Sequence, residues 1–315
     1  MTPLHEAYPG RAIRVAMTDS DADSGADVTD SDADGADDTE GGYAGTLPEE
    51  RSPAPVTVDS MAADLRGLGV ERGDTLLVHC SLSSLGWVCG GPPAVVDALQ
   101  RVLGEDGTLV MPTHTPGHSD PSWWENPPVP DDWEPTIRES MPPFRPEVTP
   151  TYGMGAVSEC FRSYPGVERS THPMFSFAAW GADGEFVVDD HSLDYSLGED
   201  APLARVYELD GRVLFLGTTH ETNTSLHLAE YRGDLPGDTQ TRGGPLLVDG
   251  EREWVEYEDI HIDSDDFPEC GAAFEDAHPE AVVRGEVGVA ECALLDQRPL
   301  VDFGVEWLES NRTDA

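Results

Sequence analysis

The feature that most constrains the fold of this 315-residue chain is a strand–loop–helix–strand pattern over residues 75–111. Thr75 to His79 is a short apolar run that leads directly into a serine-rich loop. Pro92 to Leu103 has apolar residues at helical spacing, begins with proline and ends before Gly104. Thr108 to Met111 is a second apolar run, so the pattern predicts a βαβ unit. We therefore expect an α/β fold with a mainly parallel central sheet and flanking helices.

Apolar periodicity continues along the chain. It predicts helices at 58–68, 155–161, 202–208 and 223–231, strands at 175–179 and 212–216, and further strand or helix at 253–257 and 301–308. Residues 112–150 differ, because they hold three of the seven tryptophans and many prolines but little periodicity. Such a long loop is usually functional or disordered, and the tryptophans favour order. We expect a long irregular excursion.

The beginning of the chain has another composition. The run from Thr18 to Glu40 is mainly Asp, Ser, Ala and Gly, which offer too little apolar surface to form a core. We predict a disordered acidic extension over residues 1–52 and one folded domain over residues 53–315.

The chain is strongly acidic, with 62 acidic residues, 18 basic residues that are all arginine, and a net charge of −44. This excludes binding of nucleic acid through a basic surface and adhesion to anionic membranes through a polybasic patch. Neither a run of the ~18 apolar residues that a spanning helix needs nor a secretory signal is seen, so a cytoplasmic protein is expected. Acidity without lysine is typical of a high-salt cytoplasm, where salt screens self-repulsion. An acidic face for a cationic ligand is the alternative, and composition does not separate the two.

Neither the five scattered cysteines nor the histidines favour a metal site. The cysteines show no CxxC spacing and are expected to be buried apolar side chains. Two groups of residues have ligand chemistry, namely His114, His118 and Asp120, and His220, Glu221 and His227. Proline and glycine interrupt the first group and the second lacks HExxH, so we expect no metal.

Two polar loops follow predicted strands. VHCSLSSLG (78–86) can turn backbone N–H groups toward an anion, but it lacks the P-loop GK[ST] and the GxSxG elbow, and a capping loop is the simpler interpretation. GTTHETNTSLHLAE (217–230) places His227 and Glu230 three apart on one helix face. A histidine beside a strand end suits a general base, whereas a surface histidine with an acidic neighbour is the alternative. The acidic run EYEDIHID (256–263) is typical of a solvated strand, but one of its carboxylates could orient a histidine elsewhere.

Five stretches together resemble the aminoglycoside 3-N-acetyltransferase family, which is distinct from the GNAT acetyltransferases. They are VHCSLSSLGWVCGG (78–91), LGEDGTLVMPT (103–113), RSTHPMFSFAAWG (169–181), APLARVYELDGRVLFLG (201–217) and TNTSLHLAE (222–230). Their order and spacing agree with the family over residues 58–310, outside the acidic extension. With its composition, the chain is similar to a haloarchaeal-type member.

The resemblance implies the antibiotic N-acetyltransferase fold for residues 53–315 and transfer of acetyl from acetyl-CoA, a co-substrate, to an amine, without a metal. The acceptor would be an aminoglycoside, acetylated at the 3-N of 2-deoxystreptamine, or a related amine. His227 matches the general base, and its orienting carboxylate would be Asp259 or, as second choice, Glu258. The matched CoA-contacting loop comprises Ser81, Leu82, Ser83 and Ser84, with Thr218 near the thioester. The implied acceptor contacts are Asp120, which would bind ammonium groups, His172 and Asn223.

Several alternatives stay open. The acceptor could be an endogenous amine metabolite, and a hydrolase, a metal-dependent enzyme or a non-catalytic CoA-binding protein could use the same loops. The missing GxSxG and HExxH motifs argue against the hydrolase and the metal enzyme. The chemistry predicts direct attack of the amine on the thioester in a ternary complex, with backbone N–H groups or Thr218 stabilising the oxyanion. A homo-oligomer also stays open.

Overall fold

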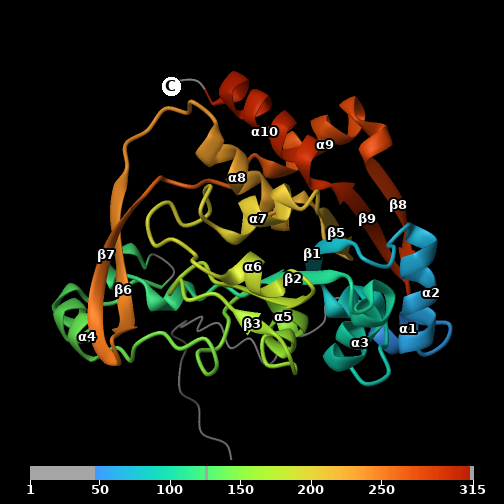
Figure 1. Ribbon diagram of the computed structural model, residues 1–315, viewed down its shortest axis with the longest axis horizontal. Coiled ribbons are helices and arrows are strands. Elements are labelled where there is room, and N and C mark those ends of the chain that lie inside the picture. Colours follow the sequence, from blue (N-terminus) through green and yellow to red (C-terminus); the bar gives the residue numbers. More distant parts are fainter. Residues whose placement is uncertain (1–46, 125–126, 313–315) are drawn as a thin grey trace, which may run out of the picture. The chain divides into compact units, whose positions relative to one another are not determined.

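A seven-stranded sheet with the order β3-β4-β2-β1-β5-β9-β8 forms the centre of the fold (Figure 1). Its strands are β1 (Thr75–Cys80), β2 (Thr108–Pro112), β3 (Glu168–Arg169), β4 (Phe177–Gly181), β5 (Arg212–Leu216), β8 (Val282–Val287) and β9 (Ala290–Asp296). The structure is a computed structural model that describes residues 47–124 and 127–312.

The sheet is parallel at its centre and antiparallel at both edges. β1 pairs in parallel with β2 and with β5. The β2–β4, β4–β3, β5–β9 and β9–β8 pairs are antiparallel. All strands except β4 and β9 therefore run in one direction, which confirms the α/β fold with a mainly parallel central sheet. The antiparallel hairpin of β8 and β9 was not foreseen, because half-exposed and charged residues interrupt the apolar pattern of β8.

Helices cover both faces of the sheet, because the side chains of each strand alternate between two cores. Leu76 and Val78 of β1 pack in the core with α2 (Val58–Leu68), α3 (Pro92–Leu103) and α5 (Gly155–Phe161). Leu77 packs in the opposite core with α6 (Gly184–Val188), α7 (Pro202–Glu208), α8 (Ser225–Arg232) and α10 (Gln297–Asn311). A third core lies between β5, β9 and α9 (Phe267–Ala277). Figure 1 shows α7, α8 and α10 on one side of β1 and β2, and α3 and α5 on the other.

Residues 112–150 form the expected irregular excursion, with only the short α4 (Glu134–Ser140) and single 3₁₀ turns in its described part. The buried Arg169 at the end of β3 holds it against the sheet. Its guanidinium donates to the carbonyl oxygens of Thr113 at 2.6 Å and Thr149 at 2.5 Å. Trp123 and Trp133 are 46% and 58% exposed, so the tryptophans do not form a core of their own.

A two-stranded antiparallel arm of β6 (Gln240–Val248) and β7 (Glu251–Asp259) packs against this excursion. Asp249 and Gly250 form its turn with positive φ angles of 51° and 85°, the conformation that a tight hairpin needs. The Phe144 N–H donates to the Pro245 carbonyl at 2.8 Å, which joins the two segments.

The described fold starts at Leu47. Residues 47–52 were predicted to belong to the acidic extension, but they are part of the fold. The one-turn helix α1 (Pro48–Arg51) is followed by Ser52, whose hydroxyl accepts the Trp87 N–H at 2.7 Å. Such polar contacts leave no apolar periodicity in the sequence, which is why they were missed. The rest of the predicted extension lies outside the described residues. No helix within the described ranges is long and apolar enough to cross a membrane.

Candidate active site

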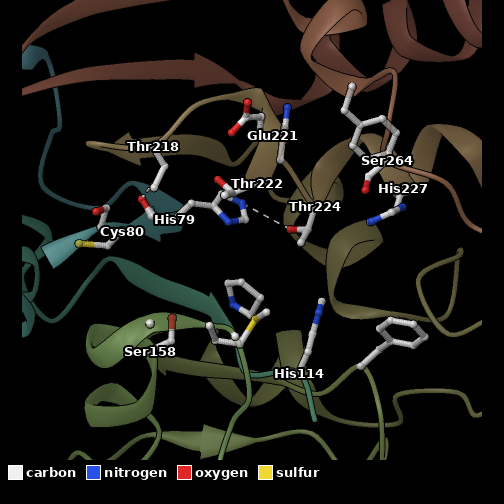
Figure 2. A pocket seen from close by; sticks show the side chains of 18 residues that line it. His79, Cys80, His114, Ser158, Thr218, Glu221, Thr222, Thr224, His227 and Ser264 are labelled. Carbon is white, nitrogen blue, oxygen red and sulfur yellow. Dashed lines mark hydrogen bonds between the residues drawn. The ribbon is translucent and has the colours of Figure 1, made fainter. Parts of the chain in front are cut away.

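A cavity of about 470 Å³ lies at the carboxyl ends of the three central parallel strands. Residues just after β1, β2 and β5 line it, among them Ser81, His114 and Thr218. The carboxyl edge of parallel strands is where α/β proteins commonly bind ligands. Residues from the start of α8 and from the segment before α9 close the other side of the cavity. Figure 2 shows the His227 ring with one nitrogen directed toward the cavity interior.

His227 lies in the first turn of α8 and has a defined orientation. Its Nδ1 is 2.5 Å from Oε2 of Glu230, three residues later on the same helix face. Glu230 is 3% exposed and also accepts the Asp263 N–H at 2.9 Å and a guanidinium N–H of Arg312 at 2.5 Å. A carboxylate that is held in this way favours a proton on Nδ1, which leaves the lone pair of Nε2 available to the cavity.

The expected contact between His227 and Asp259 is not made, because Asp259 is committed elsewhere. It is fully buried at the end of β7, where its oxygens accept hydroxyl protons from Ser196 and Tyr231 at 2.6 Å each. Glu258, the second choice, points outward and accepts the Thr241 hydroxyl at 2.7 Å. Glu230 therefore replaces both as the carboxylate that orients His227.

The expected CoA-contacting residues divide between two neighbouring cavities. Ser81 and Thr218 line the first cavity, whereas Ser84 and Thr218 line a second one of about 310 Å³. The Ser84 hydroxyl donates to the Ser81 hydroxyl at 2.8 Å, so the loop that separates the cavities is internally bonded. Leu82 and Ser83 line neither cavity. The carbonyl of Ser83 instead accepts a hydrogen bond from Arg51.

Two of the three expected acceptor contacts lie outside the cavity. Both oxygens of Asp120 accept N–H groups of Arg138, at 2.6 and 2.8 Å. Burial alone would raise the pKa of Asp120, but hydrogen bonds from Arg138 and Ser122 bring it below its ordinary value. His172 is fully buried, and its Nδ1 accepts the backbone N–H groups of Met174 and Phe175, so it is a structural residue.

Asn223 does line the cavity, but its amide serves the local backbone. Its side chain bonds to His220 Nδ1 at 3.0 Å and accepts the N–H of Ser225, the first residue of α8, at 3.2 Å. His220 in turn bonds Glu275 through Nε2 at 3.0 Å. Among the described residues, no group of three or more His, Cys, Asp or Glu is arranged to hold a metal ion.

Two further histidines line the cavity where the central strands end, namely His79, which was not singled out from the sequence, and His114, which was considered only as a metal ligand. His79 is the last but one residue of β1, and its Nε2 is 3.4 Å from the Thr224 hydroxyl. Burial, with His220 nearby, lowers the pKa of His79 to about 3. Burial, with His227 nearby, lowers the pKa of His114 to about 3. Both imidazoles are therefore neutral at neutral pH. Their places at the carboxyl ends of β1 and β2 are the signal that could have revealed them.

Cys80 is the thiol of this cavity. Burial, with Cys292 nearby, raises the pKa of Cys80 to about 12. The thiolate is the nucleophilic form of cysteine, so this side chain is unreactive at neutral pH. All five cysteines are free thiols, but only Cys270 and Cys292 are buried as expected. Cys89 is exposed, and the exposure of Cys80 and Cys160 is intermediate.

Known proteins are similar to this chain in both sequence and fold. The family model described as aminoglycoside 3-N-acetyltransferase matches residues 77–309. The chain is 45% identical over 264 residues to the prophage-derived aminoglycoside N(3′)-acetyltransferase-like protein YokD of Bacillus subtilis, covering 83% of this chain and 96% of YokD. The crystal structure of YokD superposes with a TM-score of 0.82, covering 84% of this chain and 97% of that one.

Enzymes of the same family are also similar. Aminoglycoside N(3)-acetyltransferase VII of Streptomyces paromomycinus is 39% identical, with 82% of this chain and 94% of that enzyme covered. The solved structure of AAC-IIIb with CoASH is 31% identical and has a TM-score of 0.74, with 83% and 99% of the two chains covered. With the family model spanning most of the described fold, the chain belongs to the aminoglycoside 3-N-acetyltransferase family.

Proposed function

We propose that this protein transfers the acetyl group of acetyl-CoA to an amine of an aminoglycoside, the 3-N of 2-deoxystreptamine, or of a related amine. The observation that carries the proposal is the pair of His227 and Glu230 at a cavity where the central strands end. The relatives support both substrates, since one is named for aminoglycoside N(3)-acetylation and another is solved with CoASH.

His227 would act as the general base. An ammonium group has no lone pair, so one proton must first leave to solvent. The neutral amine then attacks the thioester carbon, and a base must take a second proton from the nitrogen as the amide forms. With Nδ1 bonded to Glu230, Nε2 is the atom that takes this proton. The buried carboxylate of Glu230 stabilises the imidazolium that results. As the C–N bond forms and the C–S bond breaks, CoA leaves as a thiolate, to which the imidazolium can return the proton.

Direct transfer is supported over an acetyl-enzyme. The cavity thiol, Cys80, stays protonated at neutral pH because burial raises its pKa to about 12. Without a thiolate, this residue is a poor nucleophile toward a thioester. Thr218, whose hydroxyl bonds to the His79 carbonyl at 3.3 Å, lines the wall where the thioester oxygen would lie. We expect intersecting rather than parallel double-reciprocal plots.

The second cavity suits the phosphate-bearing part of CoA. It joins the first at Thr218 and contains Arg51 and Arg284, two cations in a chain that has few. Arg51 makes no ion pair with a described acidic residue, whereas Arg284 pairs with Glu275 at 2.5 Å. The Ser81–Ser84 loop between the cavities would then contact the pantetheine.

A thiol-release assay tests the proposed function. The wild-type protein is mixed with acetyl-CoA and, in turn, sisomicin, paromomycin and spermidine, in molar KCl. Release of one CoA thiol per acetylated amine, with at least one aminoglycoside preferred over spermidine, supports the proposal. Thiol release that does not depend on any amine would instead indicate a thioester hydrolase. No thiol release with any acceptor would indicate a CoA-binding protein without this activity.

We also propose that the acidic composition is suited to a cytoplasm with a high salt concentration. The ion pairs Arg72–Asp106 and Arg101–Asp59 are mostly exposed, so each contributes little to stability. They therefore do little to counter the repulsion among the carboxylates that give the net charge of −44. Salt shortens the range of the repulsion among the remaining carboxylates, from about 10 Å at 0.1 M to about 3 Å at 1 M. The melting temperature should fall when KCl is diluted from 2 M to 0.1 M, and an unchanged value would contradict this proposal.

A further inference from the structure

The side chain of His114 is part of the cavity wall, and its Nε2 makes no hydrogen bond to a described residue. The residue is 8% exposed, two positions after β2. Its ring packs edge-to-face against the rings of Phe175 and Phe177, with centroid distances of 5.3 and 5.2 Å. Its Nε2 is buried and has no hydrogen-bond partner within residues 47–124 and 127–312. A buried polar nitrogen without a partner costs stability, so it calls for an explanation.

The ring is uncharged under physiological conditions. Burial and the neighbouring His227, His191, His79 and Arg169 lower its pKa to about 3. A neutral imidazole has one N–H donor and one lone-pair acceptor, and it supplies no charge to balance an ion. An uncharged hydrogen-bonding group is therefore the partner that fits this wall.

His114 also has a defined place relative to the reaction. It lines the same cavity as His227, and Figure 2 shows its ring rising from the wall opposite His79 and Thr218. The Ser81–Ser84 loop, which is proposed to contact CoA and is called the donor loop below, lies on that other wall with Thr218. The wall of His114 is therefore the acceptor side.

A second, open groove of about 520 Å³ is lined by residues next in the chain to residues of this wall. The Tyr152 N–H donates to the His114 carbonyl at 3.0 Å. Tyr152 and Met174 line the groove. The residues that follow them in the chain, Gly153 and Phe175, line the cavity. The groove is lined by Trp123 and Trp124 of the excursion and by Arg242 of β6. Aromatic faces of this kind can pack against sugar rings.

We propose that Nε2 of His114 hydrogen-bonds an uncharged oxygen of the acceptor, a hydroxyl or ether close to the reacting amine. This inference rests on the proposed function and names the acceptor class within it: an amine flanked by oxygen, as opposed to a plain polyamine. His114 thereby selects and places the acceptor, while His227 takes its proton.

Two variants at one position test the assignment. His114→Phe keeps an aromatic ring between Phe175 and Phe177 but removes the nitrogen, and His114→Gln keeps a hydrogen-bonding amide. Steady-state kinetics with sisomicin and acetyl-CoA should give an acceptor KM about 10-fold higher for His114→Phe, the change that one hydrogen bond produces. The KM for acetyl-CoA should stay within about 2-fold, and His114→Gln should recover part of the loss.

The ligand-free melting temperature supplies a readout that a merely structural histidine would not give. His114→Phe should melt at the same or a higher temperature than the wild type, because an unpaired polar atom is replaced by an apolar one. An unchanged acceptor KM, an equal rise in both KM values or a lower melting temperature would refute the role of His114. A wild-type enzyme that acetylates no aminoglycoside would refute the proposed function, and this inference with it.

Discussion

Glu230 determines which ring nitrogen of His227 carries the proton. A lone imidazole exchanges its proton between two nitrogens, whereas the bond of 2.5 Å to Glu230 favours the proton on Nδ1. The carboxylate is itself fixed by Arg312 and by the Asp263 N–H, so little reorganisation is needed when the imidazolium forms. The two residues act as one unit on one turn of α8.

Replacing Glu230 by Gln should lower kcat about 10- to 100-fold, because the neutral amide no longer stabilises the imidazolium. The fold should persist, since Arg312 keeps its ion pair with Asp266 at 2.5 Å. Steady-state kinetics and a CoA titration followed by calorimetry would measure both effects. A variant with unaltered kcat would show that Glu230 does not assist the base, and one that no longer binds CoA would point to a structural defect.

The spacing of residues 227 and 230 could be predicted from the sequence, because an i, i+3 pair is local to one helix. The carboxylate inferred from the family resemblance, Asp259, was wrong as the partner of His227. Its actual partners, Ser196 and Tyr231, are 63 and 28 residues away in the chain. The ion pair that removes Asp120 from the acceptor site, to Arg138, likewise depends on how the excursion folds back. Local chemistry could be read from the sequence, and contacts between distant segments could not.

At the scale of elements, Asp259 joins three segments. It ends β7, receives Tyr231 from α8 and Ser196 from the loop before α7, and lies 3.7 Å from Arg242 of β6. A buried carboxylate with these partners orients the β6–β7 arm relative to α8.

Substituting Asp259 by Asn should therefore affect stability more than catalysis. The amide offers only one oxygen to the two hydroxyl donors and removes the charge beside Arg242, which should cost about 2–4 kcal/mol of unfolding free energy. Urea denaturation measures this loss, and kcat should stay within about 3-fold of wild type. A large fall in kcat at unchanged stability would instead restore Asp259 to the catalytic group.

The elements themselves were predictable to different degrees. The bounds of α2, α3, α5, α7 and β5 agree with the periodicity, because each has a continuous apolar face and a proline, glycine or capping residue at an end. The β6–β7 hairpin was missed as a unit, although Asp249-Gly250 between two extended runs is a strong hairpin signal. The acidic run 256–263, which includes the end of β7, was interpreted by its charge instead.

At the scale of the whole molecule, buried histidines should make the protein sensitive to mild acid. Burial lowers the pKa of His79 and His114 to about 3 and that of His191 to about 4, and it keeps His172 well below its ordinary value. Between these values and the unfolded value of about 6.5, the unfolded chain binds protons that the folded chain does not. The free energy of unfolding should thus fall as pH drops below about 6.5.

Each such histidine contributes a slope of about 1.4 kcal/mol per pH unit in that window. Denaturation at constant KCl between pH 7 and pH 5 measures the sum. His114→Phe is the matched control, since it should reduce the slope by the share of one histidine. Burial raises the pKa of carboxylates such as Glu159, but hydrogen bonds from Arg162 bring that pKa to about 2. Such a carboxylate keeps its full stabilising contribution above about pH 4.5 and loses it only below that value, so it does not affect the slope between pH 7 and pH 5. Stability that is constant from pH 7 to pH 5 would contradict neutral buried histidines.

The central claim is that His227 is the base that deprotonates the acceptor amine. The most direct test is single-turnover acetyl transfer to sisomicin by His227→Ala, with acetyl-CoA binding measured on the same preparation. We expect the transfer rate to fall about 10²–10⁴-fold while the affinity for acetyl-CoA changes little, since the donor loop is on the other side of the cavity. Transfer at close to the wild-type rate would contradict the account.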